Sequence, residues 1–330
     1  MDPNDALLTI LPSAGEPGAA VARALQLARA SGAPLHLCAL VYDPAVDLAA
    51  ARVGLALAAH ARNDILRARL FELERQAAAL DAGGVTIHCD VRWAADAAEA
   101  VIAKALEIDA RTVIKEVHRE SGFKRALFTP LDGQLLRWLP CELLLVNPQS
   151  QPAIRRMAVA LDVLAEAPED DGLNRRILRA ALRLAEYFDA RLDLVSVFPF
   201  LPTYSRALIG MSGLYQQLDA QHREAFEAYC RIHRIPEDRR HRLTGVPALA
   251  LEQFAERHGV DLLALGSVYR KGWERLLLGS TAESLVQDID ADTLLVKPAW
   301  ALEALDRALD LKALRERQAR LRLDAEAADE

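Results

Sequence analysis

The sequence contains 330 residues, enough for two domains of ordinary size, and 52% of them are hydrophobic while 5% are aromatic. This mix, rich in alanine, leucine and valine, favours helices packed on buried strands over a sandwich or barrel rich in aromatic residues. The formal net charge of −7 argues against nucleic-acid binding, because no excess of positive charge is present to neutralise a run of phosphates.

The first half of the chain is predicted to alternate strands and helices. Its strands are short, continuous apolar runs, expected at residues 6–11, 35–41, 85–91, 112–117 and 142–146. Helical spacing fills the intervals, at residues 16–31, 53–80, 94–107 and 132–139. Continuous apolar strands are typical of parallel sheets covered on both faces, and each parallel crossover needs a helix.

The second half repeats this alternation after a polar hinge that contains Pro148 and Pro152. Its strands are expected at residues 157–161, 192–198, 241–244, 262–266 and 293–296. We therefore predict two tandem α/β domains with doubly wound parallel sheets, over residues 1–148 and 153–298. Residues 299–330 are predicted to form a helix that packs back on a domain, the alternative being a coiled coil with another chain.

An internal repeat supports the two-domain organisation. Residues 141–148 match residues 291–298 at an offset of 150, and residues 108–114 match residues 260–266 at an offset of 152. We interpret the pattern as a duplication with one insertion or deletion of two residues between the two matched blocks.

The loop after Gly266 is the best candidate for a ligand site. It carries Arg270 and Lys271, and Gly279-Ser280-Thr281 then opens a helix. Backbone N–H groups at the start of a helix point toward an anion, and hydroxyl groups there both cap the helix and bind. The pattern favours a phosphate site, although glycine-bearing loops of this kind also occur simply as tight turns.

This loop resembles the Gly-x2-Gly-x9-Gly-Ser/Thr signature of the universal stress protein (UspA-like) superfamily, matched at Gly266, Gly279 and Ser280. The second glycine of the signature is replaced by Tyr269, which adds a side chain and disfavours positive φ. The first half is similar to tandem, E-type members of the family, and the resemblance extends over residues 5–298. The similar segments are Lys115-Glu116-Val117-His118, Phe128-Thr129-Pro130 and Asp132-Gly133-Gln134-Leu135-Leu136-Arg137.

The resemblance implies a flavodoxin-like or adenine nucleotide alpha hydrolase-like fold in both halves. It implies that the second half binds an adenine nucleotide, ATP with magnesium, and that the first half holds no cofactor. The family's ligand contacts fall on Ala160, Asp162, Val197, Leu265, Gly266, Arg270, Gly279, Ser280 and Thr281. The alternative for Asp162 is a turn carboxylate, and for Ala160 and Val197 it is plain core packing.

The function implied is that of a non-catalytic stress-response protein, since no residue is placed to activate water. The alternative is a ligand carrier or interaction scaffold whose degenerate pockets hold a larger or less polar molecule. In the first half Phe123, Leu127 and Phe128 favour such a guest. Domains of this family associate through their last strands, here residues 143–146 and 294–296, which implies an intramolecular pseudo-dimer and also allows a homodimer.

Other features favour plain structural roles and a cytoplasmic location. Cys38, Cys89, Cys141 and Cys230 show no metal-ligand spacing, so we expect buried thiols and no metal site. The basic run Arg239-Arg240-His241-Arg242 is expected in a solvated loop. The N-terminus lacks a secretion signal and no apolar run is long enough for a membrane span, so we expect a small molecule as partner rather than a membrane.

Overall fold

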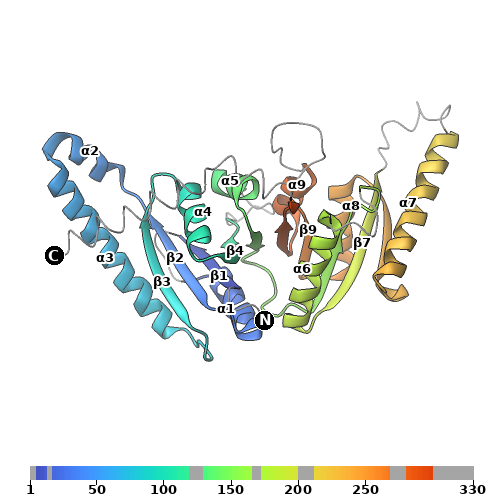
Figure 1. The fold of residues 1–330 in the computed structure, drawn as a ribbon, viewed down its shortest axis with the longest axis horizontal. Coiled ribbons are helices and arrows are strands. Elements are labelled where there is room, and N and C mark those ends of the chain that lie inside the picture. The colour runs from blue at the N-terminus through green and yellow to red at the C-terminus, as the bar shows by residue number, and fades with distance from the viewer. Residues whose placement is uncertain are drawn as a thin grey trace. The chain divides into compact units, whose positions relative to one another are not determined.

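A computed structural model of the chain describes residues 5–12, 17–118, 129–165, 172–199, 212–267 and 280–299. These residues fold into two compact units. The first unit contains residues 5–116 and 130–143, and the second contains residues 117–118, 129 and 144–299. Each unit is a sheet with helices packed against it, as the ribbon in Figure 1 shows.

The first half follows the predicted alternation. Its strands are β1 (Ala6–Leu11), β2 (Leu35–Val41), β3 (Ile87–Trp93), β4 (Ala110–Glu116) and β5 (Glu142–Val146). Its helices are α1 (Ala19–Ser31), α2 (Pro44–Val53), α3 (Leu55–Ala79), α4 (Ala97–Glu107) and α5 (Pro130–Trp138).

The second half has the same plan with different loop lengths. Its strands are β6 (Arg156–Ala160), β7 (Arg191–Pro199), β8 (Arg240–Gly245), β9 (Leu262–Gly266) and β10 (Asp292–Val296). Its helices are α6 (Leu173–Phe188), α7 (Ser212–Ile232), the short 3-10 helix η3 (Glu237–Arg239), α8 (Pro247–His258) and α9 (Ser280–Asp288). Of the predicted C-terminal helix at 299–330, all residues but the first lie outside the described ranges.

Both sheets have the doubly wound topology that the apolar strand runs predict. In the first unit the strands lie in the order β3-β2-β1-β4, and in the second in the order β10-β9-β6-β7-β8, with parallel pairing at each of these junctions. The direction of winding reverses between β1 and β4 and again between β6 and β9. Ligands of such sheets bind outside the carboxyl ends of the strands at this reversal, so the topology directs attention there.

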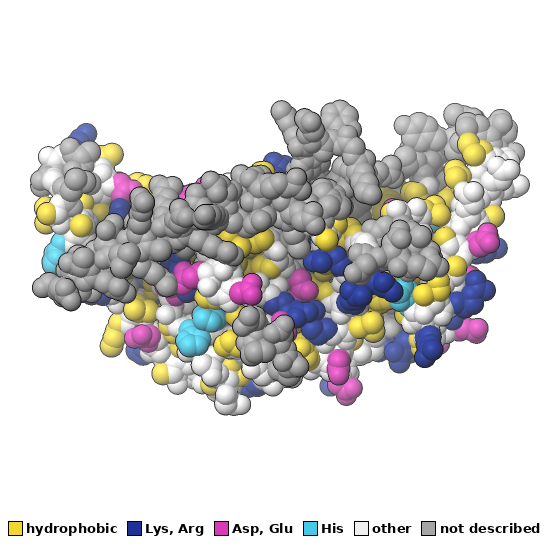
Figure 2. Space-filling model, in the orientation of Figure 1, with side chains coloured by type: hydrophobic (Ala, Val, Ile, Leu, Met, Phe, Trp, Pro, Cys, Tyr) yellow, Lys and Arg dark blue, Asp and Glu magenta, His cyan; other side chains and the backbone are white. Residues whose placement is uncertain are grey.

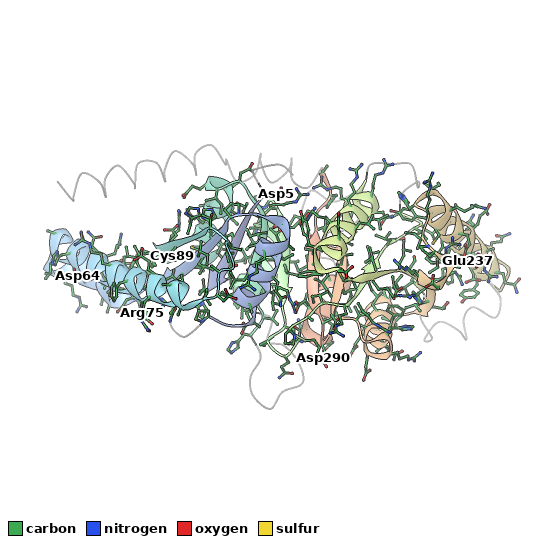
Figure 3. The ribbon with its side chains drawn as sticks, turned by 90° about the horizontal axis from the view of Figure 1, so that it is seen from below. Asp5, Asp64, Arg75, Cys89, Glu237 and Asp290 are labelled. Carbon is green, nitrogen blue, oxygen red and sulfur yellow. The ribbon has the colours of Figure 1, made fainter. Side chains whose placement is uncertain are left out.

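The long helix predicted at 53–80 is α3, and α2, which precedes it at residues 44–53, was not predicted. Gly54 separates them with φ of 127°, a conformation that other residues rarely adopt. Asp43 caps the first of the two, because its Oδ1 accepts the N–H of Ala45 at 2.9 Å. The second helix, α3, carries Asp64 and Arg75 among the exposed polar side chains that Figure 3 labels.

Hydrogen bonds at the ends of β4 and β9 correct the predicted insertion in the repeat. Val117 N–H donates to the carbonyl of Val146 at 2.9 Å, and Ser267 N–H donates to the carbonyl of Val296 at 3.0 Å. These two bonds are equivalent, and both of their residues are offset by 150. The offset of 152 arose because short apolar runs match in more than one register. Glu116, the last residue of β4, is therefore the counterpart of Gly266, the last residue of β9.

A cluster of charged side chains closes the outer edge of the first sheet. Lys104 Nζ lies 2.8 Å from Asp90 and 3.2 Å from Glu107, and Arg92 pairs with the same two carboxylates. On the neighbouring strand the His36 ring stacks on the His88 ring with centroids 4.6 Å apart. Both signs of charge also appear among the described side chains on the face shown in Figure 2.

The cysteines are less uniformly buried than predicted. Cys38 and Cys230 are buried, whereas Cys89 and Cys141 are of intermediate exposure. Burial raises the pKa of Cys38 to about 12, which makes it an inert thiol.

Candidate functional site

The carboxyl ends of three strands in the second unit meet at one edge of the sheet. The register pairs Val159 of β6 with Ala264 of β9, and Ala160 of β6 with Val195 of β7. The parallel register therefore carries Ala160, Val197 and the pair Leu265–Gly266 to the same edge. These are four of the residues that the sequence marked as ligand contacts.

Apart from Asp162, the remaining predicted contacts divide into two groups. Arg270 and Gly279, together with Tyr269, lie outside the described residues. Ser280 and Thr281 are the first two residues of α9, and the structure describes their backbone alone. The adenine and ribose side of the predicted site is thus described, and the loop of its phosphate side is not.

Gly266 has a packing role in addition to its predicted one. A Cβ atom at this position would lie 2.8 Å from Cδ2 of Leu173 and 3.3 Å from Cδ1 of Ile177, both on α6. The missing side chain therefore lets the first turns of α6 pack against the end of β9. This contact is a sufficient reason for glycine here, whether or not a phosphate approaches.

Asp162 directly follows the last strand residues of β6 and shapes a turn. Its Oδ1 accepts the N–H of Leu164 at 3.2 Å, and its carbonyl accepts the side-chain amide of Asn174 at 2.8 Å. The side chain is exposed. Asp162 thus has the turn-forming role that was its alternative, while its carboxylate still faces solvent beside the strand ends.

A buried polar chain links α7 and β8 to the end of β6. Arg242 Nε–H donates to His222 Nδ1 at 3.1 Å, and Ser196 Oγ lies 3.1 Å from His222 Nε2. Ser196 Oγ–H in turn donates to the carbonyl of Leu161 at 2.8 Å. Arg242 also pairs with Asp219, at the other end of the chain.

These contacts fix the protonation state of His222, which is 1% exposed. Because Nδ1 accepts from Arg242, the ring proton sits on Nε2 and points to Ser196. Burial first, and then the charge of Arg242, lower the pKa of His222 below its usual value. The imidazole is therefore a neutral structural link rather than an acceptor for the serine proton.

The buried chain was missed in the sequence because its members belong to three elements and form no local motif. The basic run at 239–242 was expected in a solvated loop, and this prediction is wrong. Arg240 and Arg242 lie in β8, where Arg240 pairs with Glu227 at 3.1 Å and Arg242 pairs with Asp219. The sequence of β8, Arg-His-Arg-Leu-Thr-Gly, gave no sign that its two arginines would pair with side chains of α7.

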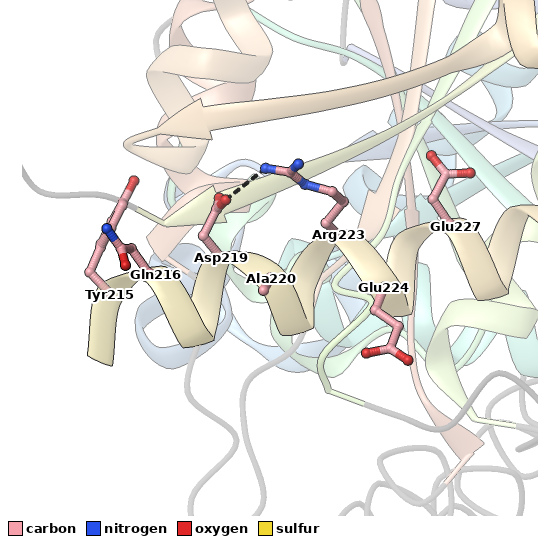
Figure 4. Close-up of a pocket in the computed structure, with 7 residues that line it drawn as sticks. All are labelled: Tyr215, Gln216, Asp219, Ala220, Arg223, Glu224 and Glu227. Atoms are coloured by element: carbon pink, nitrogen blue, oxygen red, sulfur yellow. Dashed lines mark hydrogen bonds and ion pairs between the residues drawn. The ribbon is translucent and has the colours of Figure 1, made fainter. Parts of the chain in front are cut away.

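One open groove runs along α7 and has a volume of about 510 Å³. It is lined by Tyr215, Gln216, Asp219, Ala220, Arg223, Glu224 and Glu227, all from this one helix (Figure 4). Asp219 and Arg223 pair across one turn at 3.0 Å. Among the described residues no second element contributes to the lining, so these residues do not surround a small molecule as a binding site would.

The equivalent strand end of the first unit is filled by charged side chains. Lys115 Nζ lies 2.8 Å from Oδ1 of Asp132 in the first turn of α5, and Asp132 is 0% exposed. The carboxylate of Glu116 reaches the start of α1, where its Oε2 accepts the N–H of Ala20 at 3.3 Å. His118 is exposed just beyond them. Phe123, Leu127 and Phe128 lie outside the described residues.

The described ranges contain neither a cluster of metal ligands nor a membrane-spanning helix. No group of three or more His, Cys, Asp or Glu side chains there is arranged to hold a metal ion. None of the helices in those ranges combines the length and apolarity needed to cross a bilayer.

Comparison with known proteins gives a consistent set of relatives. The family model described as "Universal stress protein family" matches residues 8–147 and again residues 154–297. The chain is 27% identical to "Universal stress protein E" of Escherichia coli K12 over 241 residues, which covers 72% of this chain and 76% of the relative. It is 25% identical to the protein of the same name from Photorhabdus laumondii over 310 residues, covering 88% and 94%.

Solved structures agree on the fold. A putative universal stress protein from Pseudomonas aeruginosa superposes with a TM-score of 0.67 at 22% identity, covering 92% of this chain and 96% of that chain. A universal stress protein from Archaeoglobus fulgidus superposes with a TM-score of 0.58 at 14% identity, covering 90% and 99%. At these identities the likeness shows the fold alone.

Proposed function

The chain belongs to the universal stress protein family as a tandem two-domain member, and we propose that it is a non-catalytic stress-response protein that holds an adenine nucleotide in its second domain. The observation that carries the proposal is the edge where β6, β7 and β9 end together. It brings Ala160, Val197 and Gly266 beside the exposed carboxylate of Asp162. This is the crevice at which doubly wound sheets take their ligands.

The described residues fit the adenosine end of such a ligand. Ala160 and Val197 offer half-buried apolar contact, and the Asp162 carboxylate is exposed to accept hydroxyl groups of a ribose. Gly266, Arg270, Gly279, Ser280 and Thr281 would hold the phosphates, with Leu265 behind them in the strand. Binding of ATP with magnesium would give the protein a nucleotide-bound state that differs from its nucleotide-free state. The first domain would hold no cofactor.

The buried chain around Ser196 supports a non-catalytic function. A serine and a histidine 3.1 Å apart suggest a nucleophile and its base. Here the serine proton goes to the Leu161 carbonyl, and the histidine nitrogen that faces the serine already carries a proton. The pair therefore stabilises the end of β6 and leaves no base to deprotonate Ser196.

Calorimetric titration with ATP and magnesium tests the nucleotide proposal. We expect one saturable binding event, lost in Gly279→Glu because the carboxylate repels the phosphates. We expect Tyr269→Gly to bind more tightly, since glycine lets the backbone approach the ligand. Gly213→Glu is the matched control, because Gly213 is exposed on α7 and a Cβ there meets nothing within 4 Å. Equal affinity in Gly279→Glu and in the control would contradict the proposal.

A ligand carrier or scaffold is the second candidate function. The specific observation in its favour is that Leu173 and Ile177 cover Gly266, which makes the strand end apolar. Mass spectrometry of small molecules that co-purify with the chain separates the two candidates. An adenine nucleotide supports the first, and a larger apolar molecule supports the second.

We also propose a cytoplasmic location. Cys38, Cys89 and Cys230 are thiols rather than half-cystines, as expected in a reducing compartment. Fractionation with a reporter fused to the chain would test this, and a periplasmic signal would contradict it.

A further inference from the structure

Helix α1 begins without a side-chain cap of its own. Its N-cap is Gly18, which has φ of −93° and ψ of −160° and offers no side-chain acceptor. The carbonyl of Gly18 accepts the N–H groups of Val21 and Ala22 at 3.1 and 3.3 Å. The earlier amide of Ala20 points outward from the helix start, as the first amides of any helix do.

An acceptor for the Ala20 amide comes from the carboxyl end of β4. Glu116, the last residue of β4, places Oε2 3.3 Å from the nitrogen of Ala20. The positive end of the helix dipole favours a carboxylate at this position. Glu116 thus caps α1 from 96 residues away along the chain.

Gly18 lies against this carboxylate. A Cβ atom on Gly18 would overlap with Oε2 of Glu116 and would approach Cδ to 3.2 Å, so a larger residue would displace the end of the Glu116 side chain. The N-cap of α6, Gly172, has nearly the same backbone conformation, with φ of −87° and ψ of −161°. A glycine at this cap is therefore common to both units, and the glutamate at the end of β4 is what distinguishes the first.

A neighbouring side chain holds the backbone of Glu116 in place. Lys115 Nζ donates to the backbone carbonyl of Glu116 at 3.0 Å and pairs with the buried Asp132 of α5 at 2.8 Å. An incoming phosphate would meet an amide already occupied by the Glu116 carboxylate, and the negative charge of that carboxylate.

We propose that Glu116 is a built-in anionic ligand that closes the first domain to phosphates and other oxyanions. Its carboxylate takes the amide at the helix start that a small oxyanion would otherwise take. The second domain has Gly266 at the equivalent position and so lacks this carboxylate. The proposal concerns the first domain alone and does not depend on nucleotide binding in the second.

Chemical rescue tests the proposal. Glu116→Gly removes the carboxylate, and inorganic phosphate or acetate can then take its place. We expect either anion to raise the Tm of the variant saturably by about 2 to 5 °C relative to chloride at equal ionic strength. Wild type should show no such rise. Glu99→Gly, which removes an exposed glutamate from the first turn of α4, is the matched control. An equal response in all three proteins would overturn the proposal.

A second measurement uses the wild-type chain and so needs no variant to fold. The amide proton of Ala20 reports directly on the charge of Glu116 in an NMR titration with acid. We expect its chemical shift to follow protonation of the carboxylate, and to stay constant in Glu116→Gln over the same pH range. An Ala20 amide that does not respond in wild type would also overturn the proposal.

Discussion

The ends of β4 and β9 occupy equivalent places in the two units and differ in size and charge. β4 ends in a glutamate that lies against a glycine at the start of α1, whereas β9 ends in a glycine covered by Leu173 at the start of α6. Gly18 and Gly172 are the N-caps of α1 and α6 and have nearly the same conformation, so the residue that takes the place of Leu173 in the first unit is Ala19. The large residue is on the strand in the first unit and on the helix in the second. The comparison teaches that each crevice is fitted to its own first helix, and that the missing glycine in the first unit is one half of a matched pair.

Two residues beside each of these strand ends also differ in charge between the two units. Lys115 and Asp132 form a buried ion pair in the first unit, and their counterparts Leu265 and Ala282 are buried apolar residues in the second. The strand ends of the first unit are therefore occupied by a pair of opposite charges. The strand ends of the second unit carry apolar or small residues up to the predicted phosphate loop.

Breaking the ion pair gives the largest expected effect. Lys115→Leu leaves the fully buried Asp132 carboxylate without its cation, and we expect the first unit to lose about 3 kcal/mol of unfolding free energy. The double variant Lys115→Leu/Asp132→Ala installs the residues of the second unit and should recover most of that loss. Urea unfolding measures both. A double variant no more stable than the single would show that the two units are not interchangeable here.

Moving the glutamate into the second unit has the next largest effect. Gly266→Glu forces a side chain against Leu173 and Ile177, and we expect the second unit to lose about 2 kcal/mol from overpacking. Adding Leu173→Ala recreates the arrangement of the first unit and should relieve part of the strain. The coupling energy from this double-mutant cycle is the measurement. A coupling energy near zero would show that the residues at positions 266 and 173 are not matched in size.

Acid should destabilise the first unit through His36 and the second through His222 and His241. In the first, burial and then His88 and Lys104 lower the pKa of His36 to about 4, and in the second burial lowers the pKa values of His222 and His241. The unfolded chain binds these protons near pH 6.5 while the folded chain does not. Stability should therefore be constant above about pH 7 and fall as the pH drops from 6.5 toward 4, by at most about 1.4 kcal/mol per pH unit per histidine.

The matched variant for this effect is His222→Gln, which keeps one acceptor and one donor without a titrating ring. It should reduce the acid dependence of the second unit, to which His241 still contributes, and leave that of the first unchanged. Domain-resolved hydrogen exchange as a function of pH separates the two contributions. An unchanged slope in the second unit would exclude His222 as its source.

Much of the fold follows from the sequence because its strands are continuous apolar runs between helical segments. The similar composition of these strands also caused the wrong offset of 152 in the repeat, since runs of leucine, valine and alanine match at offsets of 150 and 152 alike. Only the hydrogen bonds of Val117 and Ser267 select the first offset. Helix α2 at residues 44–53 was not predicted at all, whereas the predicted helix at 53–80 matches α3 closely.

The candidate site was less predictable than the fold. Strand order places Ala160 and Gly266 at one edge, and the sequence motif marked both. The contact between Gly266 and Leu173, and the chain from Ser196 through His222 to Arg242, join residues far apart in the sequence. No local pattern encodes them, because each residue alone reads as an ordinary core or surface position.

Hydrogen exchange in the presence of ATP and magnesium tests the difference between the two crevices most directly. We expect slower amide exchange at residues 160–165 and 262–267 of the second unit, with no change at residues 17–22 of the first. Slower exchange at residues 17–22 of the wild-type chain would contradict this expectation, because an anion would then bind at the helix start that Glu116 occupies.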